Sequence, residues 1–291
     1  MMRPNRWWML AAVLALPMVF LLDRTRRGEE HYQAEWMQSG DVYLRTLRTG
    51  QGDTTVLLLH GYGESLLAYR GLISPLARRF TVVALDLPGS GLSEKPGGSY
   101  ALNSMVARLS RALDSWIRGP VVIVGHSMGG EIAAALAIER PDRIIKAVLI
   151  APAGHGLGMG LSDEPFSNRQ QFMAAWSVKA RELLVPMADD DWITEPPELP
   201  EAARSDSASR RAAEAFLRDF DFTALQGRFG DIRQPTLLIW GRLDPLIPID
   251  IGRKVASELR NVRFVELGNS WHRPHVEQPE RVVREILEFI G

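Results

Sequence analysis

Gly125-His126-Ser127-Met128-Gly129 is the stretch that decides the fold. It follows an apolar run, residues 121–124, and it precedes a helical pattern, residues 129–139. A serine at such a strand-to-helix turn stands in a strained backbone conformation, and the glycines remove side chains that would collide across the turn. We therefore predict that Ser127 projects over the carboxyl end of a sheet, near the positive end of the following helix.

Short apolar runs, rich in branched residues and ended by turn formers, recur along the chain at residues 56–59, 81–85, 121–124, 147–150, 236–240 and 262–267. Helical patterns lie between them at residues 66–79, 103–118, 129–139, 250–259 and 279–290. This alternation predicts an α/β fold, a mostly parallel sheet with helices on both faces. Ligands of such sheets bind at the carboxyl ends of the strands.

One long segment interrupts the alternation. Residues 153–231 contain no buried strand pattern, but they hold apolar-periodic pieces at Phe166–Leu184 and Arg210–Phe220. We interpret the segment as a helical lid inserted over the sheet. The predicted organisation is an N-terminal anchor or signal segment (1–27), a first part of the core (28–152), the lid (153–231) and a second part of the core (232–291).

The N-terminus departs from the pattern of an ordinary soluble enzyme. An uncharged run, Trp7–Leu22, lies between arginines and has no small-x-small cleavage site after it. As a helix the run would span about 24 Å, a little short of a hydrocarbon layer of about 30 Å, and Pro17 lies inside it. We predict an uncleaved anchor in the inner (cytoplasmic) membrane, with the side of the catalytic domain undecided. The alternatives are a cleaved signal, which gives a secreted or periplasmic protein, and a soluble apolar arm.

Charge and composition exclude several classes of function. The formal net charge is -1, so no overall field attracts nucleic acid, and none is expected as a partner. The chain has no cysteine, which excludes disulfides, thiolate metal sites and a cysteine nucleophile.

The chain resembles the α/β-hydrolase family from about Val42 to Ile290. The resemblance rests on five motifs in the family order: His60-Gly61-Tyr62-Gly63, residues 86–93, residues 125–130, Gly241-Arg242-Leu243-Asp244 and residues 272–279. Each motif is modestly specific alone, and the ordered set is strongly specific. The resemblance implies a nucleophile, an acid and a histidine, in that order along the chain.

A serine hydroxyl is a weak nucleophile and needs a base. Of the six histidines, only His272 and His275 lie downstream of the candidate acid. His272 follows the run 262–267 through a short loop, from which a base can reach the nucleophile, whereas His275 lies about one helical turn further on. We therefore predict His272 as the base and place His275 outside the triad.

Asp244 is the predicted acid, because it lies three residues beyond Gly241 at the end of the run 236–240. The competing interpretation is a turn aspartate before Pro245. Some family members carry the acid after the strand that follows the nucleophile helix. Here that strand ends at residues 151–154 without a nearby carboxylate, which leaves Asp163 as a distant alternative.

The family pattern also implies an oxyanion hole, formed by the backbone N–H groups of Tyr62 and Met128. Four further polar residues are assigned supporting roles. We expect His60 to brace the oxyanion loop and Asp86 to hold the next turn by hydrogen bonds, whereas His126 and His155 would line the pocket.

Ser127 favours acyl transfer to water, because relatives that open epoxides or displace halides use an aspartate at this position. We predict a carboxylesterase-like or lipase-like enzyme acting on a small-molecule ester, with no metal or organic cofactor. Apolar lid residues favour a lipophilic substrate: Leu157, Met159, Phe166, Phe172, Met173 and Trp176. The alternatives are a cofactor-independent hydrolase of carbon–carbon bonds and a ligand-binding protein with slow turnover.

Overall fold

The computed structural model describes residues 31–156, 192–196 and 206–291. Within these ranges a nine-stranded sheet has the order β7-β1-β2-β4-β3-β5-β6-β8-β9. Its strands are β1 (Tyr32–Ser39), β2 (Val42–Thr49), β3 (Thr55–Leu59), β4 (Thr81–Leu85), β5 (Val121–His126), β6 (Ile144–Ile150), β7 (Ile193–Thr194), β8 (Thr236–Gly241) and β9 (Val262–Leu267).

The strands from β4 to β9 in the sheet order run parallel to one another, whereas β2 pairs antiparallel with both β1 and β4. Parallel strands need crossover connections, and the chain provides them as helices. The tight β1–β2 turn includes Gly40 with a φ of 65°, a conformation that glycine adopts without steric cost. The predicted mostly parallel α/β sheet is therefore confirmed.

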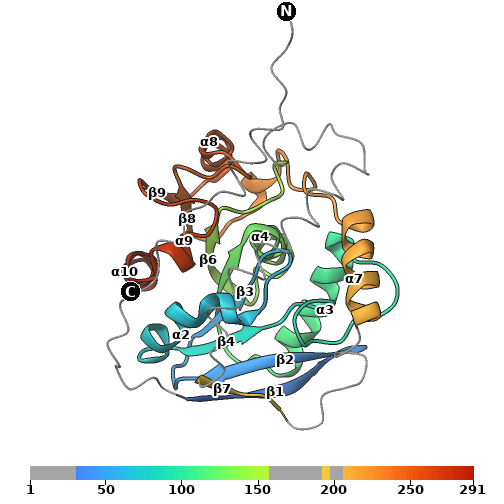
Figure 1. Ribbon diagram of the computed structural model, residues 1–291. Helices are drawn as coiled ribbons and strands as arrows, with labels where there is room; N and C mark the ends of the chain where they lie inside the picture. Colours follow the sequence, from blue (N-terminus) through green and yellow to red (C-terminus); the bar gives the residue numbers. More distant parts are fainter. Residues whose placement is uncertain (1–30, 157–191, 197–205) are drawn as a thin grey trace, which may run out of the picture. The chain divides into compact units, whose positions relative to one another are not determined.

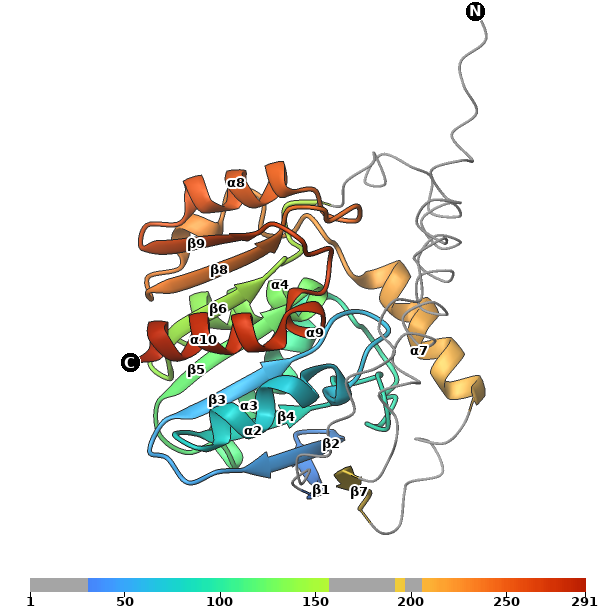
Figure 2. The same cartoon turned by 60° about the vertical axis from the view of Figure 1, so that its left-hand side comes forward.

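Helices cover both faces of the sheet (Figures 1 and 2). Alternate strand residues pack into two separate cores, as the two-residue period of a strand requires. One core includes α3 (Leu102–Ser115), α4 (Ser127–Glu139), α7 (Asp206–Asp219) and α8 (Ile249–Glu258). The other includes α2 (Arg70–Ala77) and α10 (Pro279–Ile290). The short elements are η1 (Leu66–Tyr69), η4 (Phe229–Asp231) and α9 (Pro274–Glu277).

Residues near the two ends of the predicted lid are hydrogen-bonded to each other. The Gly154 amide donates to the Phe222 carbonyl at 2.9 Å, and the Leu225 amide donates to the Gly154 carbonyl at 3.1 Å. From this junction α7 lies against the core, where Phe216 packs on Tyr62 and Tyr100 with ring centroids 6.2 and 4.5 Å away. A helix in the predicted lid thus reaches the loop that follows β3.

Three strands, β1, β2 and β7, were not expected. β1 escaped prediction because its residues mix polar and apolar types without clear alternation. β7, two residues inside the segment predicted to be helical, pairs parallel with β1. The boundaries of the lid remain a prediction, and its residues 157–191 and 197–205 lie outside the described ranges, as do the apolar residues that favoured a lipophilic substrate.

The prediction of a membrane-anchored protein is corrected. A spanning helix needs about 20 consecutive apolar residues, and no helix in the described part of the chain is long and apolar enough to cross a membrane. The run at residues 7–22, on which the prediction rested, lies outside those residues. Neither a membrane partner nor a membrane location is carried further.

Candidate active site

Ser127 stands at the first position of α4, directly after β5, with a φ of 51°. A non-glycine residue in this left-handed region is strained by about 1–3 kcal/mol and persists where the surrounding structure holds it. The flanking glycines permit the turn. A Cβ on Gly125 would lie 2.2 Å from the Gly129 carbonyl oxygen, and one on Gly129 would lie 2.2 Å from the Leu59 carbonyl oxygen.

The structure brings Ser127, Asp244 and His272 together. His272 Nε2 lies 3.0 Å from Ser127 Oγ, and His272 Nδ1 lies 2.7 Å from Asp244 Oδ2. All three residues are buried. They come from three separate elements: the start of α4, the loop after β8 and the loop after β9. Each follows the carboxyl end of a parallel strand, where the sequence placed it.

Asp244 is held by the backbone around it. Its Oδ1 accepts hydrogen bonds from the amides of Leu246 and Ile247, both at 2.9 Å, which leaves Oδ2 for the imidazole. A carboxylate fixed in this way holds Nδ1 protonated, so that Nε2 presents its lone pair to the serine hydroxyl. The arrangement is able to remove a proton from Ser127 during attack on an electrophile. Asp163, the alternative acid, lies outside the described residues.

Comparison with known proteins agrees with this fold. Residues 54–279 match the model of the alpha/beta hydrolase fold family. The chain belongs to the α/β-hydrolase fold family.

Three similar proteins are hydrolases by name. A 2-hydroxy-6-oxononadienedioate/2-hydroxy-6-oxononatrienedioate hydrolase of Cupriavidus pinatubonensis is 30% identical over 271 residues, which covers 84% of this chain and 89% of that protein. A bacterial membrane phospholipase A has a TM-score of 0.66 at 25% identity, covering 98% of this chain and 91% of the other. A serine hydrolase from Cycloclasticus zankles has a TM-score of 0.72 at 21% identity, covering 89% of this chain and 98% of the other. At this identity the likeness shows a shared fold alone.

In this α/β-hydrolase, the loop after β3 packs against the start of α4. His60 joins the loop to the β4 end, since its Nε2 accepts from the Leu87 amide at 2.9 Å and its Nδ1 donates to the Gly61 carbonyl at 2.8 Å. A Cβ on Gly129 would lie 2.4 Å from the His60 carbonyl oxygen. The amide of Met128, at the second position of α4, belongs to the first turn, where a helix supplies no acceptor of its own. The oxyanion roles of Tyr62 and Met128 remain predictions.

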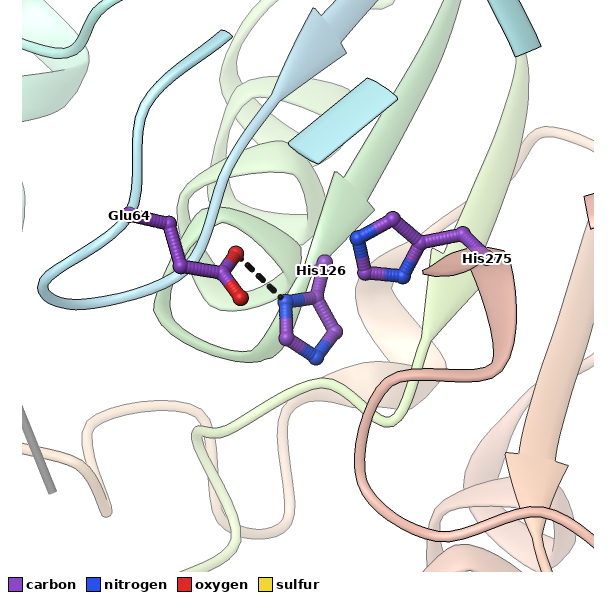
Figure 3. Close-up of side chains that lie close together, drawn as sticks. All are labelled: Glu64, His126 and His275. Atoms are coloured by element: carbon purple, nitrogen blue, oxygen red, sulfur yellow. Dashed lines mark hydrogen bonds and ion pairs between the residues drawn. The ribbon is translucent and has the colours of Figure 1, made fainter. Parts of the chain in front are cut away.

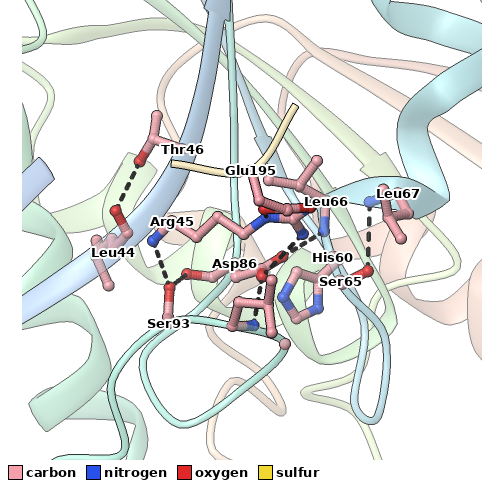
Figure 4. Close-up of polar contacts among 12 residues, drawn as sticks. Leu44, Arg45, Thr46, His60, Ser65, Leu66, Leu67, Asp86, Ser93 and Glu195 are labelled. Carbon is pink, nitrogen blue, oxygen red and sulfur yellow. Dashed lines mark hydrogen bonds and ion pairs between the residues drawn. The ribbon is translucent and has the colours of Figure 1, made fainter. Parts of the chain in front are cut away.

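Asp86 holds the turn after β4, as its position suggested (Figure 4). Its Oδ1 accepts from the Leu66 amide and its Oδ2 from the Leu92 amide, both at 2.7 Å. Arg45 lies 3.3 Å from the same carboxylate and also binds Glu195, next to β7. Asp86 therefore ties β2 to the start of η1 and to the turn after β4.

Glu64, His126 and His275 form a second buried group (Figure 3), and His126 contacts the backbone carbonyl of His272. Their ligand-type atoms lie within 4.8 Å of one another, close enough to hold a metal ion. Arg273 Nε, however, lies 2.7 Å from Glu64 Oε1 and forms an ion pair with this carboxylate. A divalent ion would add two further positive charges beside this single carboxylate, which is costly. The charge balance therefore disfavours a metal here.

The pKa values of this group reflect its charges. Burial works to raise the pKa of the Glu64 carboxyl, but Arg273 and His126 together hold it well below its usual value. Burial, followed by the neighbouring His126, lowers the pKa of His275 well below its ordinary value. Neither ring nitrogen of His275 has a hydrogen-bond partner among the described residues. Glu64 is therefore ionised and His275 is neutral.

Glu131 lies one turn after Ser127 on α4 and is fully buried. In the described part of the chain neither of its carboxyl oxygens has a hydrogen-bond partner. Burial, followed by the charge of Asp221, raises its pKa well above the usual value. The group is thus held neutral next to Gly154 and Leu225.

Two predicted pocket histidines have other partners. His155 Nε2 lies 2.9 Å from Glu258 on α8, and His126 faces Glu64 at 3.1 Å. Sequence reasoning missed Glu64, Arg273 and Glu131, because a buried charge has no signature in a single sequence. It also missed Ala151, the other non-glycine residue with positive φ (41°) in the described ranges, at the end of β6.

Proposed function

We propose that this hydrolase cleaves a carboxylic ester through an acyl-enzyme formed on Ser127. The observation that carries the proposal is the chain of contacts from Asp244 through His272 to Ser127, at 2.7 and 3.0 Å. A hydroxyl aligned with an imidazole that a buried carboxylate orients is the arrangement required for nucleophilic acyl transfer.

In this mechanism His272 Nε2 takes the proton of Ser127 as Oγ attacks the ester carbonyl. The negative charge that develops on the carbonyl oxygen is stabilised by the backbone N–H groups of Met128 and Tyr62. The intermediate collapses, the C–O bond to the alcohol breaks, and His272 gives its proton to the departing oxygen. Water, deprotonated by the same histidine, then attacks the acyl-enzyme, releases the acid and restores Ser127.

The apolar surroundings favour an ester with a hydrophobic acyl group. Phe216 of α7 packs edge-on against Tyr62, whose amide is a proposed oxyanion donor. Small-molecule sites bind mainly through apolar contact, and a few polar groups fix the orientation of the ligand. The name of one similar protein, a phospholipase A, agrees with an ester substrate.

Hydrolysis of a carbon–carbon bond is the second candidate, because the relative with 30% identity is named a dienedioate hydrolase. Such a substrate carries two carboxylates and calls for cations near the base. Arg273, which follows His272 in the chain, is buried and paired with Glu64. This pairing favours the ester over the dienedioate.

The deciding experiment compares substrates on one preparation. The proposal predicts hydrolysis of p-nitrophenyl esters that improves as the acyl chain lengthens, and turnover of a 2-hydroxy-6-oxo-dienedioate at least about 100-fold slower in kcat/KM, because the buried ion pair leaves its carboxylates uncompensated. The reverse order of the two substrates would establish the second candidate.

A separate measurement distinguishes an enzyme from a slow ligand-binding protein. A fluorophosphonate should label the wild-type protein and leave Ser127→Ala unlabelled, since the probe reacts with activated serines. Wild-type protein that stays unlabelled, and hydrolyses no ester of the panel, would favour the binding protein.

A further inference from the structure

His126, the residue before the nucleophile, touches the loop that carries the base. Its Nε2 lies 2.8 Å from the backbone carbonyl oxygen of His272, and the two rings have centroids 4.9 Å apart. A carbonyl oxygen only accepts hydrogen bonds, so Nε2 of His126 carries a proton and donates it to this carbonyl.

The other nitrogen of the same ring faces a carboxylate. His126 Nδ1 lies 3.1 Å from Glu64 Oε2, which also accepts the Gly61 amide at 2.9 Å. Glu64 Oε1 lies 2.7 Å from Arg273 Nε in an ion pair, so the carboxylate is ionised. A neutral His126 with its proton on Nε2 would turn a lone pair toward this carboxylate. A proton on each nitrogen satisfies both contacts.

We propose that His126 is an imidazolium in the resting enzyme, and that it acts as a positioning residue that fixes the His272 loop over Ser127 and opposes protonation of the base. The positioning part of this inference rests on the proposed function, because it assigns the base to His272. The protonation state of His126 rests on hydrogen-bond geometry alone.

The charge has a defined set of neighbours. The charged and titratable groups around His126 are Glu64 on the loop after β3, Arg273 and His275 at α9, His272 with Asp244 behind it, His60 at the end of β3 and Tyr69 of η1. Of the two carboxylates, Glu64 contacts His126 and Asp244 contacts His272. His126 is thus joined by a hydrogen bond to the backbone carbonyl of the base residue, and the two ring centroids lie 4.9 Å apart. A positive charge at this position disfavours a second positive charge on His272.

The state of His126 is tested on the wild-type protein by ¹⁵N NMR of its histidine rings, with His126→Phe to assign the signals. Both ring nitrogens of His126 should carry protons throughout the range from about pH 6 to about pH 8. A single ring N–H in this range would overturn the proposal. A change in these signals when Zn²⁺ is added, reversed by a chelator, would also overturn it, because Nδ1 would then be a metal ligand.

The positioning role is tested by kinetics of His126→Phe, which removes the donor and the charge but keeps a planar ring. We expect kcat to fall about 10-fold to 100-fold with KM within about twofold, because the base loses its alignment. The acid limb of the kcat/KM profile should also move up by about one pH unit, since the base then protonates more readily. A purely structural role would leave this limb in place, and that result contradicts the proposal.

His275→Phe is the matched control, because His275 packs on the same ring, at 4.4 Å between centroids, but is neutral and makes no hydrogen bond through its ring nitrogens within the described residues. It should leave both kcat and the acid limb near the wild-type values. An equal effect of the two substitutions would overturn the special role of His126. Failure of the proposed function is recognised separately, because an inactive wild-type protein still gives the NMR result.

Discussion

Asp244 Oδ2 lies 2.7 Å from His272 Nδ1, while Oδ1 of the same carboxylate accepts two backbone amides. In the Asp244→Asn variant the new side chain should therefore keep the same position. Its amide oxygen would accept from the two backbone N–H groups, and its NH₂ group would face His272. That contact forces the proton of His272 onto Nε2, which is then unable to accept the proton of Ser127. We expect kcat to fall about 10⁴-fold at nearly unchanged thermal stability. A loss of less than about tenfold in an ester assay would show that the tautomer does not matter.

Glu131→Gln tests the buried neutral carboxyl on α4. Because the pKa of Glu131 is raised in the folded protein above the ordinary value of 4.5, the unfolded chain loses this proton first as pH rises. Between the unfolded-state and folded-state pKa values of Glu131, this group therefore lowers the wild-type free energy of unfolding by about 1.4 kcal/mol for each pH unit. The variant has no such proton, so its stability relative to wild type should rise with pH in this window. Urea unfolding at a series of pH values measures the difference, and parallel curves for the two proteins would refute it.

Gly129→Ala tests the tight turn around Ser127. A methyl group there would lie 2.2 Å from the Leu59 carbonyl oxygen, which belongs to the rigid backbone at the end of β3. Alanine usually favours a helix by about 1 kcal/mol over glycine, but overpacking should outweigh this and give a net loss of about 1–3 kcal/mol in the free energy of unfolding. Gly268→Ala is the control, because nothing lies within 4 Å of its added methyl group. Equal denaturation midpoints for the two variants would contradict the close packing.

Arg45→Met tests the ion pair that ties β2 to the turn after β4. The substitution leaves Asp86, which is fully buried, without its cation and should lower the free energy of unfolding by about 3–5 kcal/mol. Glu195→Gln removes the other carboxylate, whose side chain is 34% exposed, and should cost about 1 kcal/mol or less. Chemical denaturation of both variants distinguishes the two contributions. If Arg45→Met lowers the free energy of unfolding no more than Glu195→Gln does, burial of the Arg45–Asp86 pair does not make it more important for stability.

The core sheet was predictable from the sequence because strands buried on both faces read as continuous apolar runs. The runs 81–85 and 262–267 coincide with β4 and β9, and the helix at 279–290 coincides with α10. The β1–β2 hairpin edge was less visible, since β1 is only partly buried and its residues do not alternate cleanly. β7 is too short to produce a pattern of its own.

The meeting of the three side chains proposed for catalysis was predictable for a different reason. Ser127, Asp244 and His272 each follow an apolar run, and parallel strands bring their carboxyl ends to one edge. The buried charges beside them were not predictable, because Glu64 and Arg273 look like ordinary loop residues. Their pairing depends on a loop after β3 and a loop before α9 meeting in space, and local pattern carries no information on such contacts. His126 was assigned to the pocket lining, whereas it contacts the His272 carbonyl.

The central claim is that Ser127 forms an acyl-enzyme, and mass spectrometry of the protein trapped during turnover of a p-nitrophenyl ester tests it most directly. Acid quenching within the first turnover should give one added acyl group, located on the peptide that contains Ser127. Ser127→Ala should show neither the added mass nor ester hydrolysis above the uncatalysed rate. An acyl group on another residue, or undiminished hydrolysis by Ser127→Ala, would contradict the account.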